Sequence, residues 1–107
     1  MNSPAKTPTP VEYLRLHNAA AADAFVALRN AAVSGPLDAH TCEFVVLGSL
    51  VVTGNEGSFK VHARRLLRDG VAADALRQAA MVTLAATATF GQVIAALKWV
   101  DAVCAEA

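Results

Sequence analysis

Residues 42–52 read CEFVVLGSLVV, and this almost uninterrupted apolar run decides the fold. Hydrophobic period alone does not separate a buried helix from a buried strand here, because four of the residues are β-branched valines. The ends of the run settle the question. Asp38 is a favourable helix N-cap, and Gly54-Asn55 is typical of a helix C-terminus. Because residues 38–53 are also longer than an ordinary strand, we predict a central helix.

A second start signal lies at Thr9-Pro10, where Glu12 is placed to complete a capping box. The apolar spacing that follows predicts one long helix, which Ser34-Gly35-Pro36 ends. Similar signals place the predicted helices at residues 10–33, 38–53, 56–69, 74–88 and 92–105, with a break at Phe90-Gly91. The predicted fold class is therefore all-α, a bundle of about five helices. Residues 1–9 are expected to form a flexible N-terminal tail, and residues 10–107 a single domain.

Composition narrows the classes of partner. The 107 residues carry 9 basic and 9 acidic side chains, and a net charge of zero provides no broad positive field for a phosphate backbone. Nucleic acid is therefore not an expected partner. The chain is 55% hydrophobic and 17% charged, which is rich in apolar residues for so small a domain. We therefore expect part of its apolar surface to pack against other copies in a homo-oligomer.

Cysteine and leader patterns point to the cytoplasm. Cys42 and Cys104 lie far apart and form neither a CxxC pair nor half of a zinc set, and no role is predicted for Cys104. The first ten residues contain three prolines and no apolar run, so they do not resemble a signal peptide. Residues 78–97 contain no charge, but they include several polar residues and alanine is the most frequent of the others, so we expect them to be buried in protein and not in a membrane.

Glu43 and His62 are the strongest candidates for chemistry. An acid inside an apolar run must be paired, protonated or placed in a pocket if the run is buried. An antiparallel hairpin about Gly54-Asn55 would bring Glu43 within about 6 Å of His62 along the helix axes. The pair is then either an acid/base relay or a satisfied structural contact, and spacing alone favours the structural contact. A metal site of His40, Glu43 and His62 is disfavoured, because such spacings arise often by chance, and no metal or cofactor is predicted.

The chain resembles the carboxymuconolactone decarboxylase and AhpD-like alkylhydroperoxidase superfamily over residues 37–100. The resemblance rests on Glu43, on the turn region with Asn55 and Ser58, on His62, and on the run ARRLLRDGVAADALRQAAMVTL that follows. It implies an AhpD-like helical bundle, a trimer or hexamer, and Glu43 and His62 as catalytic residues. In the peroxidase members of the superfamily a Glu precedes a CxxC pair, and a His follows the second Cys by four residues. Aligning His62 puts the two cysteine positions at Asn55 and Ser58.

Neither Asn55 nor Ser58 can replace a redox thiol at neutral pH, so peroxidase activity is not expected. Decarboxylase-like members also lack the CxxC pair, which implies acid/base chemistry on a small carboxylate or lactone. Asn55, Ser58 and Arg65 are the candidate substrate-binding residues. Two alternatives stay open: a non-catalytic oligomer that binds a small ligand or partner, and peroxide reduction through Cys42, although a Cys in this context is more often an inert core residue.

Overall fold

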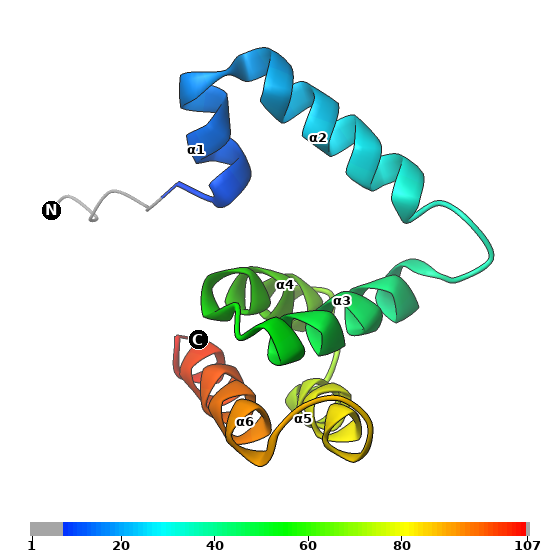
Figure 1. The fold of residues 1–107 in the computed structure, drawn as a ribbon, viewed down its shortest axis with the longest axis vertical. Helices are drawn as coiled ribbons and strands as arrows, with labels where there is room; N and C mark the ends of the chain where they lie inside the picture. The colour runs from blue at the N-terminus through cyan, green and yellow to red at the C-terminus, as the bar shows by residue number, and fades with distance from the viewer. Residues whose placement is uncertain (1–7, 107) are drawn as a thin grey trace, which may run out of the picture. The chain divides into compact units, whose positions relative to one another are not determined.

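The computed structural model describes residues 8–106, and these fold into α-helices joined by short turns, with no strand among them. The chain divides into two compact units, Met1–Leu37 and Asp38–Ala107. Figure 1 shows the helices in chain order, coloured from blue to red. Their bounds are α1 Pro10–His17, α2 Ala19–Ala32, α3 Ala39–Thr53, α4 Glu56–Arg68, α5 Ala73–Met81, the 3₁₀ turn η1 Val82–Ala85, and α6 Phe90–Ala105. The all-α prediction is confirmed.

The first unit contains two helices where the sequence predicted one. Thr9 caps α1 as expected, since its hydroxyl accepts a hydrogen bond from the Glu12 N–H at 3.2 Å. The helix stops at Asn18, whose backbone is extended (φ −160°, ψ 94°) and whose side chain accepts from the Ala21 N–H. Asn competes for helix N–H groups through its short polar side chain, so here it ends α1 and caps α2. The prediction of one continuous helix was wrong.

The α3 and α4 boundaries follow the sequence signals. Asp38 caps α3 through the Thr41 N–H at 2.8 Å, and Asn55 caps α4 through the Ser58 N–H at 3.2 Å. Between these helices Gly54 adopts a left-handed conformation at φ 69°, which costs glycine no Cβ clash. The turn at Gly54 therefore joins α3 to α4 directly.

The connection between α5 and α6 differs from the prediction, both where α5 ends and where α6 begins. The helix predicted to run to residue 88 ends at Met81, because the Thr83 hydroxyl bonds to the Ala80 carbonyl and the Thr83 carbonyl accepts the N–H of Ala88 in a tight turn. The last helix starts at Phe90, not at Gln92. Thr89 and Gln92 form a reciprocal capping box there, so the Phe90-Gly91 pair starts α6 and does not break a helix.

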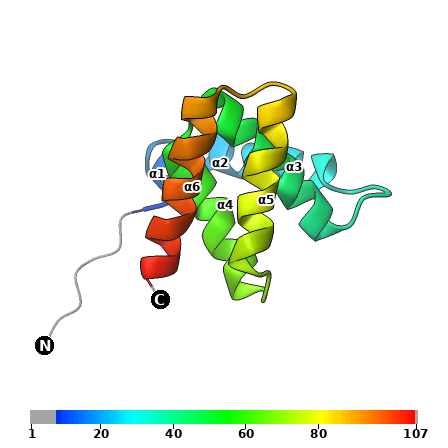
Figure 2. The same cartoon turned by 90° about the horizontal axis from the view of Figure 1, so that it is seen from below.

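Helices α3, α4, α6 and α5 form a closed ring in the second unit, in which each helix packs against its two neighbours. Figure 2 shows α5 and α6 running side by side in this unit. Fully buried side chains fill the centre, the largest being Phe59, Leu47, Leu66, Leu76, Val51 and Val100. Phe59 also contacts the Trp99 ring at a centroid distance of 5.3 Å. Across residues 8–106, no helix is long and apolar enough to span a membrane.

Candidate functional site

The predicted pairing of Glu43 and His62 is present. Glu43 lies in α3 and His62 in α4, and the Gly54 turn brings the two helices together. Glu43 Oε2 lies 2.6 Å from His62 Nδ1, and the two side chains are 14% and 13% exposed. The contact is short because the carboxylate carries charge, and it is shielded from most solvent because both side chains lie between packed helices.

Arg65 joins the pair from the next turn of α4. Its Nη1 donates to Glu43 Oε1 at 3.0 Å, so the two carboxylate oxygens accept from two different side chains. Arg65 remains 37% exposed. A guanidinium has five N–H donors, so Arg65 can hold Glu43 in place and still reach an anion from solvent. Of the three predicted substrate-binding residues, Arg65 is the one that the structure brings into contact with Glu43.

Asn55 and Ser58 have a different placement. Asn55 is the N-cap of α4, and its side-chain oxygen accepts from the Ser58 backbone N–H. Ser58 lies one turn before His62 on the same face of the helix. Neither Asn55 nor Ser58, both within the described part of the chain, hydrogen-bonds to Glu43 or His62. The structure thus gives Asn55 a capping role and places Ser58 one helical turn before His62.

The arrangement is suited to proton transfer. A carboxylate can only accept hydrogen bonds, so Glu43 directs the Nδ1–H of His62 toward itself and sets the ring orientation. The other ring nitrogen, Nε2, is then the atom that can exchange a proton with a substrate. A positive charge that develops on the imidazole is stabilised by the adjacent carboxylate, and the Arg65 guanidinium beside it favours an anionic substrate.

His40, Glu43 and His62 do not form the metal site that was considered in the sequence analysis. His40 Nε2 lies 3.4 Å from Asp69 Oδ2 instead. Within residues 8–106 no three His, Cys, Asp or Glu side chains are grouped to hold a metal ion. Cys42 and Cys104 are both half-buried and neither forms a disulfide.

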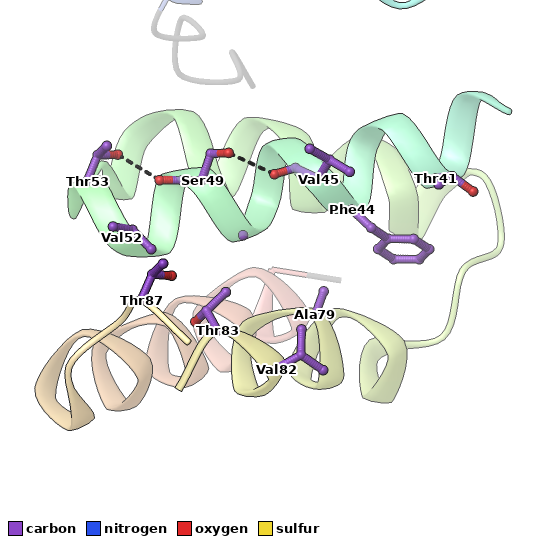
Figure 3. A pocket seen from close by; sticks show the side chains of 11 residues that line it. Thr41, Phe44, Val45, Ser49, Val52, Thr53, Ala79, Val82, Thr83 and Thr87 are labelled. Atoms are coloured by element: carbon purple, nitrogen blue, oxygen red, sulfur yellow. Dashed lines mark hydrogen bonds between the residues drawn. The ribbon is translucent and has the colours of Figure 1, made fainter. Parts of the chain in front are cut away.

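The second unit also contains a groove that the sequence analysis did not predict. It is an open groove of about 660 Å³ between α3 and the α5–η1 segment, and Figure 3 shows its lining. Val45 lines the groove, whereas Glu43 lies about 200° around α3 from Val45, at about 100° per residue. The lining includes no charged side chain: Thr41, Phe44, Val45, Gly48, Ser49, Val52, Thr53, Ala79, Val82, Thr83 and Thr87.

Small residues create this groove, and they are the signal by which the sequence could have revealed it. A Cβ added at Gly48 would lie 3.4 Å from the Thr83 methyl, so glycine permits the close approach of α3 to η1. The Ser49 and Thr53 hydroxyls donate to carbonyls of α3 itself, as the dashed lines in Figure 3 mark. The groove is therefore mainly apolar and lies apart from the Glu43 cluster.

Comparison with known protein families supports the family resemblance noted in the sequence. The model of the carboxymuconolactone decarboxylase family matches residues 19–102, which is most of the chain. The protein belongs to this family, within the AhpD-like superfamily. No curated protein and no solved structure matches the chain significantly.

Proposed function

We propose that this protein is an acid/base catalyst that acts on a small carboxylate or lactone. The observation that carries the proposal is the cluster of Glu43, His62 and Arg65, in which one shielded carboxylate holds both a histidine and an arginine. The name of the family, carboxymuconolactone decarboxylase, indicates the first substrate to test. The substitution of both dithiol positions by Asn55 and Ser58 argues against a peroxidase.

In the proposed reaction Arg65 attracts the anionic substrate and His62 handles the proton. Loss of carbon dioxide from a conjugated carboxylated lactone leaves the bonding electron pair in the lactone system. Protonated His62 then donates its Nε2 proton to a ring carbon, and Glu43 keeps the imidazole oriented throughout. Solvent returns a proton to His62 before the next turnover, so the cycle balances without a cofactor.

The test is turnover of carboxymuconolactone, followed by release of carbon dioxide. We expect His62→Gln to reduce the rate by roughly a hundredfold or more. His40→Gln is the matched control, because His40 is a second histidine on the same unit whose ion-pair partner is Asp69. Absence of turnover by the parent protein, or an equal rate in His62→Gln, would reject the proposal. The non-catalytic ligand-binding alternative would then stand.

We also propose that the chain assembles into a homo-oligomer, with a trimer or hexamer expected from the family resemblance. The support is the number of large apolar side chains that stay exposed: Tyr13, Leu16, Phe25, Val26, Leu28, Val33, Leu37, Val45, Met81, Val82, Leu84 and Phe90. Burial of an exposed apolar side chain contributes about 1.5–3 kcal/mol, so association that covers several of them is favourable.

A further inference from the structure

We propose that Ser58 is a nucleophile at the same site and that the protein hydrolyses lactones or esters through a covalent acyl-serine. The inference rests on the proposed role of His62 as a base. It assigns to Ser58 a role beyond lining the site, and it names a cyclic or linear ester as the substrate class. Three groups carry the argument: the Ser58 hydroxyl, the His62 imidazole and the Glu43 carboxylate.

Helix geometry places the first two groups together. Ser58, His62 and Arg65 are spaced four and three residues apart in α4, so they form one stripe along the helix. The Cβ atoms of Ser58 and His62 are then about 5–6 Å apart. Side chains of a helix lean toward its N-terminus, and for His62 this direction is toward Ser58.

The Glu43 carboxylate is the third group, and it orients the base. The site then has a nucleophile (Ser58), a base (His62) and an orienting acid (Glu43). Glu43 Oε2 lies 2.6 Å from His62 Nδ1, on the α3 side of the imidazole. The Ser58 hydroxyl makes no hydrogen bond to any residue in the 8–106 range, so rotation about one side-chain bond can turn it toward the ring without breaking a contact. Catalytic hydrogen bonds are often long before substrate binds and shorten in the complex.

The surroundings of Ser58 suit an ester carbonyl. Ser58 is the third residue of α4. Its own N–H donates to the Asn55 side chain, whereas the N–H groups of Glu56 and Gly57 at the start of the helix lack helical acceptors. These groups and the helix dipole stabilise negative charge on a carbonyl oxygen during attack. Gly57, the preceding residue, is exposed, and a Cβ placed there would meet nothing within 4 Å, so this turn of α4 is open to solvent. Arg65, on the same stripe, binds a carboxylate on the substrate.

The reaction proceeds in two steps. Ser58 Oγ attacks the ester carbonyl, its proton passes to His62 Nε2, and the carbon–oxygen bond to the leaving alkoxide breaks as His62 protonates that oxygen. For a lactone the leaving hydroxyl stays attached to the acyl group, because the ring has opened. Water, deprotonated by His62, then attacks the acyl-serine and releases a hydroxy acid, and Ser58 recovers its proton. One water is consumed per ester cleaved, and no oxidant or metal takes part.

Dihydrocoumarin, a simple aromatic lactone, is the probe for hydrolysis. The parent protein should open it, and Ser58→Ala should lower the rate by roughly a hundredfold or more. Ser34→Ala is the matched control and should leave the rate unchanged, because the Ser34 hydroxyl bonds only locally to the Asn30 carbonyl. Ser58→Cys places a different nucleophile, a thiol, at the same side-chain position and should retain hydrolysis. Equal rates for the parent and Ser58→Ala would overturn the proposal, as would a parent protein that does not open the lactone.

A serine-directed fluorophosphonate locates the nucleophile independently of turnover. Mass spectrometry should find the adduct on Ser58 in the parent protein and much less adduct in His62→Gln. Labelling of another residue, or of none, contradicts the proposal. The two proposals fail differently: decarboxylation that depends on His62 but persists in Ser58→Ala would leave the acid/base function standing without a nucleophilic serine. Decarboxylation and hydrolysis that are both independent of His62 would reject the two together.

Discussion

Glu43 accepts hydrogen bonds from His62 and Arg65 while it is largely shielded from solvent. Its replacement by Gln preserves the shape but introduces an N–H₂ donor. If that donor faces His62, the imidazole proton must move from Nδ1 to Nε2, and a base that carries its proton at Nε2 can no longer accept one there. The residue therefore controls which nitrogen of His62 is available for chemistry.

We expect Glu43→Gln to lose roughly a hundredfold or more in turnover, with a free energy of unfolding equal to or slightly above that of the parent. Stability is retained because the shielded carboxylate charge is removed, while the Arg65 guanidinium that loses its partner is 37% exposed and can be solvated. Rates and thermal unfolding, measured at one protein concentration, test both parts. A loss of roughly 1–3 kcal/mol in stability would instead identify a structural contact between Glu43 and His62.

We predict that the protein does not reduce peroxide, because the two positions of the peroxidase CxxC pair hold no cysteine. Asn55 and Ser58 offer no thiolate, and Cys42 and Cys104 are half-buried. Consumption of an alkyl hydroperoxide with a dithiol reductant should therefore be the same for the parent and for the Cys42→Ser, Cys104→Ser double variant. A clearly faster parent protein would show that one of these thiols is active.

At the scale of elements, the turn between α3 and α4 controls the site. Gly54 has φ 69°, and although a Cβ would meet nothing within 4 Å, an L-residue is strained at this backbone angle. Gly54→Ala should lower the free energy of unfolding by about 1–2 kcal/mol, the cost of a left-handed residue. Gly91→Ala in α6 is the control. Gly91 is helical and equally open, so alanine there should stabilise by about 0.4–1 kcal/mol. Chemical denaturation measures both variants, and equal effects would contradict the argument.

The end of α6 is tied to α4 by an ion pair that depends on pH. Arg64 donates to Glu106 from Nε at 2.7 Å and from Nη2 at 2.8 Å, and these hydrogen bonds lower the pKa of Glu106 below its ordinary 4.5. A lowered folded-state pKa contributes stability above the unfolded value, and that stability is lost as the pH falls through the folded value. The pair therefore stabilises the protein at neutral pH and not in strong acid.

The corresponding test compares the parent with Glu106→Gln from pH 7 down to about pH 3. The parent should be the more stable at pH 7, and the two curves of unfolding free energy should converge as the pH falls. Asp38, whose pKa is also lowered by its hydrogen bonds to Thr41, adds the same acid-dependent loss to both proteins and cancels in the difference. Parallel curves would mean that the Arg64–Glu106 pair contributes nothing.

At the scale of the whole molecule, large exposed apolar residues occur in both compact units, and they are the basis for the proposed homo-oligomer. We predict that light scattering at micromolar concentration gives a mass several times the 11.1 kDa of one chain. A monomer mass would contradict the prediction. As a second measurement, replacing Val82, which is 61% exposed, by Glu should weaken the assembly if this part of the surface is covered.

Much of the element pattern could be predicted because its signals are local. The caps at Thr9, Asp38 and Asn55 act on N–H groups within three residues, so the sequence near each cap is sufficient. The end of α1 at Asn18 was not predicted, because the apolar spacing continues across this residue. Spacing does not show whether a side chain competes with the helix for backbone hydrogen bonds. Thr89 was missed as the start of α6 for a similar reason: Phe90-Gly91 resembles a break unless the capping box is recognised.

The all-helical fold, the turn at Gly54 and the choice of Glu43 and His62 as candidates could all be predicted from the sequence. Periodicity, helix caps and an acid within an apolar run can be recognised without knowledge of tertiary contacts. The contact between the Glu43 carboxylate and Arg65, and the ion pair between His40 and Asp69, became known only from the tertiary structure. The groove beside Gly48 was likewise recognised only in the structure, although the small residues that border it are visible in the sequence. Each of these depends on how two helices are rotated about their axes when they pack, and that rotation is set by side-chain packing across the whole core.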